Sequence, residues 1–241
     1  MSAPDDDPWE RHAGWWQDGF TEGADPEYVE QIVPLALELL QGYERVLDIG
    51  TGEGQLARLL ADAGAQVIGL DPTVAQLTRA LELAGGPTYA RSTAESLPIA
   101  DASVDAVLAC LVFEHIPDHR PAIAEVARVL RPGGRFAFFL NHPLLQCPGS
   151  GWIVDHILDE EYWRVGRYLV ADVVMEELAP GVVLPFVHRP LSEYVNALAD
   201  AGLSLVRMLE PAPPSGFVAR APEYEASVDI PRLLVLVCER R

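Results

Sequence analysis

Short apolar segments alternate with helical patterns through the middle of the chain, and this alternation constrains the fold more than any other feature. Four segments have the composition of buried strands: 46–49, 67–71, 104–111 and 135–140. Helical patterns lie between them, at 55–64, 73–85 and 121–130. Apolar strands separated by helices are typical of parallel strands that are buried on both faces. The sequence therefore predicts an α/β fold with a doubly wound sheet.

The segment before this alternation predicts an N-terminal tail and a helical lid over residues 1–41. Asp25-Pro26 provides a helix N-cap followed by proline, and Pro34 should kink or break the helix that follows. Four aromatic side chains could order over a ligand as a lid, or could simply pack a first helix onto the sheet: Trp15, Trp16, Phe20 and Tyr28. We favour the lid, and we assign residues 42–241 to the main domain.

After residue 140 the alternation stops for almost fifty residues. We expect an insertion at about 141–189, with a short helix at 155–164 and strands at 168–175 and 182–188. Its aromatic residues would suit a pocket for an organic molecule. A helix at 190–201 and strands at 203–209 and 232–239 should then complete the sheet.

The charge and the cysteines of the chain limit its partners and its compartment. With 17 Lys plus Arg against 36 Asp plus Glu, the formal net charge is −19, which argues against nucleic acid and membrane surfaces as partners. The 3 cysteines are far apart, and no metal site can be built from their spacing. With no signal peptide in the sequence, we expect a cytoplasmic protein, as a monomer or a homodimer.

A glycine-rich turn follows the first predicted strand of the sheet. The sequence VLDIGTGEG (46–54) places glycines at 50, 52 and 54, so the backbone can bend sharply and approach a ligand at the start of the next helix. The spacing differs from the G-x-G-x-x-G of dinucleotide sites. Asp71 ends the second strand, where a carboxylate can accept hydrogen bonds from both hydroxyls of a ribose. It could also cap the following helix.

These segments resemble the class I S-adenosylmethionine-dependent methyltransferases. VLDIGTGEG and VIGLDP are similar to the first two motifs of the family, and the residues 92–109 and 128–136 are similar to later ones. Within the family, the small-molecule branch typified by quinone-biosynthesis methyltransferases is the most similar. The resemblance implies a seven-stranded sheet whose last strand, 232–239, is antiparallel.

The resemblance also implies a donor and a set of residues that hold it. The donor would be S-adenosyl-L-methionine and the acceptor a small organic molecule, with most of the rate supplied by in-line positioning. Asp71 would hold the ribose, the glycine turn the methionine part, and Ala94-Glu95 the adenine. The full set of expected donor-binding residues is Asp48, Gly50, Thr51, Gly52, Gln55, Asp71, Pro72, Ala94, Glu95, Cys110 and Leu111.

A base would be needed if the acceptor loses a proton, and histidine is the natural candidate at neutral pH. His115 follows the fourth strand and His142 follows the fifth, both at the carboxyl edge of the sheet, so these two are the candidate catalytic residues. His115 could instead only brace the donor loop. We expect Glu53, Glu114 and His119 to be solvated. Arg189 could bind an acidic acceptor, but in a chain this acidic we expect it to form a structural ion pair.

Two other functions remain open at this point. A nicotinamide-dependent oxidoreductase would use a related glycine turn, although the spacing and the lack of a nearby cation for a phosphate count against it. A non-catalytic protein that binds S-adenosylmethionine could keep every donor motif. A nucleic-acid methyltransferase is disfavoured by the charge.

Overall fold

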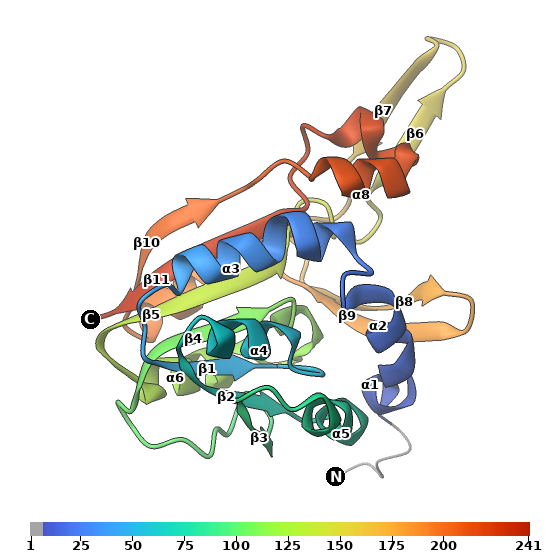
Figure 1. Ribbon diagram of the computed structural model, residues 1–241. Helices are drawn as coiled ribbons and strands as arrows, with labels where there is room; N and C mark the ends of the chain where they lie inside the picture. The colour runs from blue at the N-terminus through green and yellow to red at the C-terminus, as the bar shows by residue number, and fades with distance from the viewer. Residues whose placement is uncertain (1–6) are drawn as a thin grey trace.

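A seven-stranded sheet runs through the centre of the computed structural model, which describes residues 7–241 (Figure 1). Its strands are β1 (Arg45–Ile49), β2 (Gln66–Asp71), β3 (Thr88–Arg91), β4 (Val104–Cys110), β5 (Leu130–Asn141), β10 (Leu203–Leu209) and β11 (Leu233–Arg240). They lie in the order β10-β11-β5-β4-β1-β2-β3. Strand β11 is antiparallel to both neighbours, whereas β1 to β5 pair in parallel. The predicted doubly wound sheet with an antiparallel last strand is therefore confirmed.

Helices cover both faces of the sheet, because its central strands are apolar on both sides. Ala106 and Leu108 of β4 pack with α3 (Val33–Leu39) and α4 (Gln55–Asp62). The alternate residues, Val107 and Ala109, pack on the opposite face. The helices of that face are α6 (His119–Val129) and α7 (Leu191–Asp200), while α5 (Val74–Leu83) lies beside β2 and β3. This two-sided burial explains the almost continuous apolar runs of the strands.

The helix predicted after Asp25-Pro26 is divided at its proline. Residues Tyr28–Ile32 form a π-helical segment, η2, whose last turn is closed by the Val33 N–H donating to the Tyr28 carbonyl. Pro34 has no N–H with which to continue the ordinary pattern, so a wider turn precedes it. The proline thus produces the expected irregularity, and it places Tyr28 against the sheet.

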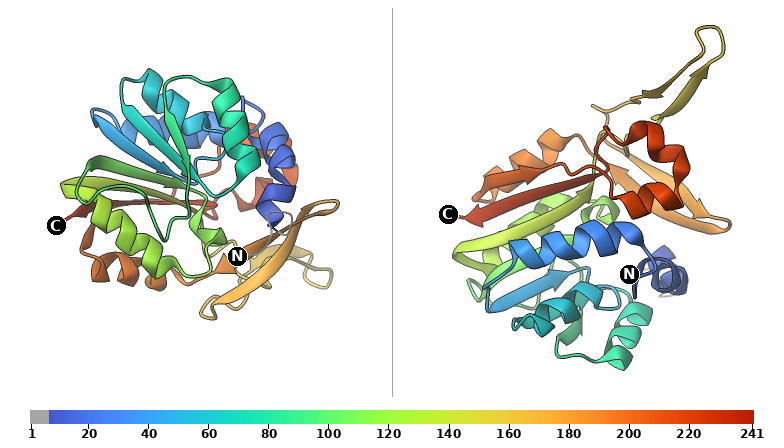
Figure 2. Two further views of the ribbon diagram at one scale, coloured as in Figure 1. Left: turned by 90° about the horizontal axis from the view of Figure 1, so that it is seen from below. Right: turned by 45° about the horizontal axis from the view of Figure 1, so that its top comes forward.

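The insertion consists of two β-hairpins, and the predicted helix at 155–164 is wrong. One hairpin pairs β6 (Gly151–Asp155) with β7 (Glu160–Arg164). The other pairs β8 (Asp172–Ala179) with β9 (Val182–His188), as the two predicted strands required, although the first begins later than expected. Figures 1 and 2 show the β6–β7 hairpin projecting from the rest of the molecule.

The turn of the β6–β7 hairpin accounts for the error. The Asp155 carboxylate accepts hydrogen bonds from the N–H groups of Ile157 and Leu158, at 2.8 and 3.1 Å. This contact is the same one that an aspartate makes at a helix N-cap, so the local sequence favours either structure. Asp159 then adopts a left-handed conformation, φ 54°, and the chain reverses. Cross-strand contact between Trp152 and Trp163, with ring centroids 5.6 Å apart, completes the hairpin.

The remaining elements are short helices and turns. They are α1 (Pro8–Arg11), α2 (Ala13–Phe20), the 3-10 turn η3 (Phe113–His115), α8 (Ser215–Arg220) and the 3-10 turn η4 (Pro222–Ser227). Residues 1–6 of the predicted N-terminal tail lie outside the described residues. Within residues 7–241 no helix has the length and apolar character needed to cross a membrane.

Candidate functional site

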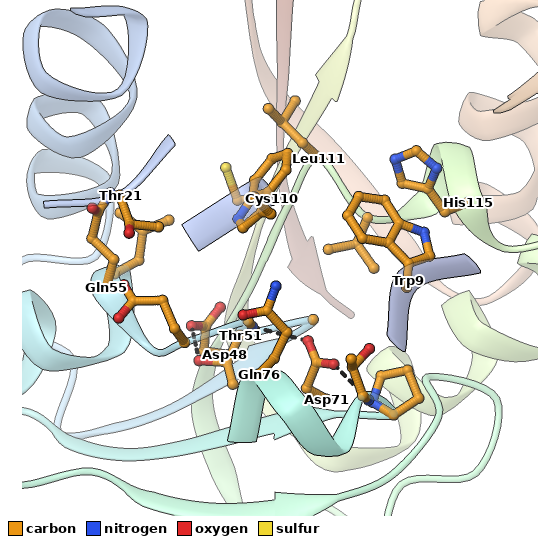
Figure 3. Close-up of a pocket in the computed structure, with 18 of the residues that line it drawn as sticks. Trp9, Thr21, Asp48, Thr51, Gln55, Asp71, Gln76, Cys110, Leu111 and His115 are labelled. Carbon is orange, nitrogen blue, oxygen red and sulfur yellow. Dashed lines mark hydrogen bonds between the residues drawn. The ribbon is translucent and has the colours of Figure 1, made fainter. Parts of the chain in front are cut away.

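One pocket lies at the carboxyl ends of β1, β2 and β4, and Trp9 and Trp16 of the N-terminal helices also line it (Figure 3). Its empty space, with open solvent at the mouth included, is about 920 Å³. In an open α/β sheet, ligands bind at this edge. Its lining residues all lie between positions 9 and 116 of the chain: Trp9, Trp16, Thr21, Tyr28, Asp48, Gly50, Thr51, Gly52, Glu53, Gln55, Leu56, Asp71, Pro72, Thr73, Gln76, Cys110, Leu111, Val112, His115 and Ile116.

The pocket contains most of the residues that the sequence predicted for the site. Those present are Asp48, Gly50, Thr51, Gly52, Gln55, Asp71, Pro72, Cys110, Leu111 and His115. Leu111 has a left-handed backbone, φ 56°, which is an uncommon conformation for a leucine. The structure therefore brings the glycine turn, the end of β2 and the end of β4 to one cavity.

The glycine turn between β1 and α4 needs glycine for two reasons. Gly50 has φ +68°, and its N–H donates to the Leu70 carbonyl at 2.7 Å. A Cβ at Gly50 would also overlap the Val112 side chain, with Cγ1 only 2.8 Å away. Both the conformation and the close approach exclude a side chain at this position.

Gly50→Ala is therefore expected to lower the free energy of unfolding by about 2–4 kcal/mol, from the left-handed backbone and the overlap with Val112 together. Urea unfolding measures this change. The matched control is Gly133→Ala, since Gly133 has φ +76° and nothing within 4 Å of its Cβ position. Equal losses from the two variants would contradict a role for crowding at Gly50.

Two buried carboxylates face the pocket from the ends of β1 and β2. Asp48 accepts a hydrogen bond from the Thr51 hydroxyl at 2.7 Å, and burial raises its pKa to about 7. Asp71 accepts from the N–H groups of Gly52 and Thr73, at 2.9 and 2.8 Å. Burial raises the pKa of Asp71 also, although these two N–H groups oppose the rise. The pocket thus concentrates acidic groups at its floor.

The N-terminal helices cover the pocket and are fastened to α5. The Glu10 carboxylate accepts from the N–H groups of Val74 and Ala75, at 2.7 and 2.9 Å, where the helix dipole favours a negative charge. Gln17 donates to the Gln76 side chain at 3.0 Å. Trp9 and Trp16 line the pocket, whereas the predicted Trp15 does not. The sequence can indicate where α1 begins, but only the contact of Glu10 with the start of α5 shows where this helix lies in the fold.

His115 lies at the mouth of the pocket, between the N-terminal helices and the insertion. Its Nδ1 is 2.9 Å from the Pro185 carbonyl of β9. The rings of Trp9 and Phe186 stand edge-on to its ring, with centroids at 4.7 and 5.0 Å. Because a carbonyl can only accept, Nδ1 carries the proton and Nε2 keeps its lone pair. Burial lowers the pKa of His115 to about 4, so the ring is neutral at neutral pH.

Three predicted site residues are not among those that line the pocket. His142 is buried, with Nε2 2.8 Å from the Glu210 carboxylate and Nδ1 accepting from the Leu144 N–H at 3.1 Å. Both ring nitrogens therefore have protein partners. Ala94 is buried in the apolar core beside α6, and Glu95 is half-buried in the loop that follows β3. The residues that line the pocket include no aromatic residue of the insertion. Phe186 packs against the ring of His115.

Three groups predicted to be solvated are buried, so those predictions are wrong. Glu53 forms an ion pair with Arg58 at 2.9 Å. Glu114 accepts from the backbone and side-chain nitrogens of Asn141, at 2.6 and 3.1 Å, and burial raises its pKa to about 7. His119 is 5% exposed and packs edge-on against Tyr194. The partners of Glu114 and His119 are distant in the sequence, whereas Arg58 lies only one helical turn beyond Glu53.

The pocket is acidic, and its lining contains no arginine among the residues that the structure describes. Within residues 7–241, no three His, Cys, Asp or Glu side chains are grouped so as to hold a metal ion. The arrangement combines a deep acidic floor, an aromatic and apolar wall, and one neutral imidazole at the mouth. It can hold a cationic molecule below and an apolar one beside His115.

Comparison with known proteins relates this chain to methyltransferases. Residues 47–138 match a family described as a methyltransferase domain. An uncharacterized methyltransferase of Mycobacterium tuberculosis is 41% identical over 181 residues, which is 74% of this chain. The match spans 66% of that relative, so the chain covers just under two thirds of its length.

Two further proteins are similar to this chain. A demethylmenaquinone methyltransferase of Thermus thermophilus is 38% identical over 119 residues, covering 47% of this chain and 53% of that protein. The crystal structure of an S-adenosylmethionine-dependent methyltransferase from Mesorhizobium loti superposes with a TM-score of 0.75. It is 28% identical and the match covers 87% of this chain and 96% of that one.

Proposed function

Because this chain belongs to the class I S-adenosylmethionine-dependent methyltransferases, we propose that it transfers a methyl group from S-adenosylmethionine to a small organic acceptor. The donor, when bound, supplies an electrophilic methyl group on a sulfonium cation. The chain's own task is to hold donor and acceptor in line, which can contribute about 7–11 kcal/mol to the lowering of the barrier.

The observation that supports this proposal is the charge of the pocket. Asp48 and Asp71 are buried at its floor, and no arginine lines it within the described residues. Such a site suits a cationic donor without phosphates, and it is poorly suited to the pyrophosphate of a dinucleotide. The same charge counts against the oxidoreductase alternative.

The residues divide into a donor part and an acceptor part. We assign the ribose to Asp71, at the end of β2, and the methionine part to the Gly50–Gly54 turn beside Asp48. The wall formed by Trp9, Val112 and Ile116 offers an apolar surface to the acceptor. A neutral ring or chain fits this surface better than an anion does, because the lining offers no guanidinium partner.

His115 is the proposed base for an acceptor that must lose a proton. Its Nδ1–H is held by the Pro185 carbonyl, so Nε2 can take the proton from the acceptor atom. A base with a pKa of about 4 is weak, yet an oxygen that has gained a methyl group becomes a much stronger acid than imidazolium. Transfer to Nε2 is then downhill as the new bond forms.

Two measurements on the full-length chain test the proposal. Incubation with methyl-labelled S-adenosylmethionine and fractions of a metabolite extract should label at least one small molecule. S-adenosylhomocysteine should raise the melting temperature, and NADH should not. Stabilisation by NADH alone would favour an oxidoreductase, and donor binding without any labelled product would favour a non-catalytic binding protein.

Donor affinity should depend on pH through Asp48. Its carboxyl is neutral below a pKa of about 7 and ionised above it, and a cationic donor prefers the ionised form. Binding should therefore lower this pKa and release a proton, so affinity falls as the pH drops below 7, by at most about tenfold per pH unit. Calorimetry in two buffers of different ionisation enthalpy measures the released proton.

The control for this pH effect is Asp48→Asn. It should bind the donor more weakly, with an affinity that changes little between pH 6 and 8. An unchanged pH profile in this variant would show that another group, such as Glu114, is responsible.

A further inference from the structure

The turn that carries His115 is held by a buried arginine from a distant part of the chain. Arg189 directly follows β9 and is 3% exposed. Its guanidinium donates to the carbonyl oxygens of Phe113, at 3.0 Å, and of Pro117, at 2.9 Å, and also to that of Ile116. Three carbonyls of a single turn therefore converge on one side chain.

The partners of this cation are dipoles and not the carboxylate expected from the sequence. None of the ion pairs found among the described residues includes Arg189, and its guanidinium also donates to the Tyr194 hydroxyl at 3.3 Å. The positive charge of Arg189 opposes the rise in the pKa of Glu114 and contributes to lowering that of His119. The guanidinium presents its N–H donors in a rigid planar fork, which fixes the three carbonyls in one geometry, whereas a lysine ammonium has three rotatable donors on a flexible stem.

The residues just before Arg189 hold the His115 ring itself. Pro185 supplies the carbonyl that fixes the proton on Nδ1, and the Phe186 ring packs against the imidazole. The segment 185–189 thus controls both the backbone of the turn and the orientation of the ring. Arg189 does not line the pocket, so any effect it has on the reaction passes through the turn that it holds, which contributes His115 and Ile116 to the lining.

We infer that Arg189 is a positioning residue for the methyl transfer: it fixes the turn 113–117 so that His115 keeps its Nδ1–H on the Pro185 carbonyl and its Nε2 lone pair available in the pocket. This inference rests on the proposed function. It also connects the base with the insertion, because β9 of the insertion supplies the Pro185 carbonyl that orients His115.

The test uses the full-length chain with ¹⁵N-labelled histidine. Long-range proton–nitrogen spectra should show the Nδ1–H tautomer of His115 in the wild type. In Arg189→Met the two tautomers should mix, and the pKa of His115 should move towards the ordinary value of about 6.5. Methyl transfer should fall by about 10- to 100-fold, because a small misplacement of a reacting group is costly. The affinity for S-adenosylhomocysteine should stay within about twofold.

Two further variants separate positioning from stability. Arg189→Lys keeps the charge without the planar fork, so its transfer rate should lie between those of the wild type and Arg189→Met. If Arg189→Met does not fold, Arg189→Lys replaces it in the test. Guanidinium ion, added far below denaturing concentrations, should restore part of the rate of Arg189→Met. Arg207→Met, at an exposed position of β10, should change neither spectrum nor rate.

Two results would overturn the inference. One is a folded Arg189 variant with the wild-type tautomer and rate. The other is a loss of S-adenosylhomocysteine affinity as large as the loss of transfer, because that would indicate a general structural role. Absence of methyl transfer by the wild-type chain would instead refute the proposed function, whatever the spectra of the variants show.

Discussion

Replacement of His115 by asparagine is expected to lower the rate of methyl transfer by about 10²–10⁴-fold, which is the usual contribution of a positioned base. The ring lies at the mouth of the pocket with Nδ1 bound to the Pro185 carbonyl. Asparagine is of similar size but cannot accept a proton at neutral pH. The loss should appear in kcat, while the affinity for S-adenosylhomocysteine should change little, because His115 belongs to the acceptor side.

The pH profile provides a second test of His115. Since burial lowers its pKa to about 4, the ring stays neutral at neutral pH, and the wild-type enzyme should lose this base only as the pH falls towards 4. His156→Asn, at an exposed position of the β6–β7 turn, is the matched control and should leave transfer unchanged. Wild-type activity in His115→Asn would reduce His115 to a brace for the loop after β4.

Replacement of Asp71 by asparagine is expected to weaken donor binding by about 10²–10³-fold. A hydrogen bond to a charged group contributes about 1.5–3 kcal/mol, and a ribose offers two hydroxyls to this carboxylate. Asparagine keeps one acceptor oxygen and loses the charge. It also cannot accept from both the Gly52 and the Thr73 N–H groups, so the glycine turn should loosen. Calorimetry with S-adenosylhomocysteine measures the change.

Asp71 could alternatively serve only as a cap for α5, and the experiment distinguishes the two roles. In that case Asp71→Asn would lower the melting temperature while the folded variant bound the donor product normally. The matched control is Asp62→Asn, which changes an exposed carboxylate at the end of α4 and should affect neither property. Normal binding by Asp71→Asn would contradict its assignment to the ribose.

The sheet and the donor side of the pocket were predictable because their signals are local. The central parallel strands β1, β2 and β4 are apolar runs that end in a polar or glycine-containing turn, and the carboxyl ends of parallel strands share one edge. Asp71 and the glycine turn after Asp48 could therefore be placed together from their positions alone. The close approach of Val112 to Gly50 explains why the turn requires glycine.

The acceptor side could not be predicted to the same extent, because long-range contacts define it. His142 follows β5 at the expected edge, yet its Nε2 bonds to Glu210, which lies 68 residues further along the chain. Arg189 was expected in an ion pair, whereas it binds carbonyls that lie more than 70 residues before it. The β6–β7 turn uses the aspartate contact of a helix cap, so the local sequence did not distinguish a helix from a hairpin.

The structure of the chain in complex with S-adenosylhomocysteine tests the central claim most directly. The account predicts that the ribose hydroxyls bind the Asp71 carboxylate and that the sulfur faces the part of the pocket lined by His115. A complex in which the ribose contacts a different residue, or in which the sulfur faces away from His115, would contradict it.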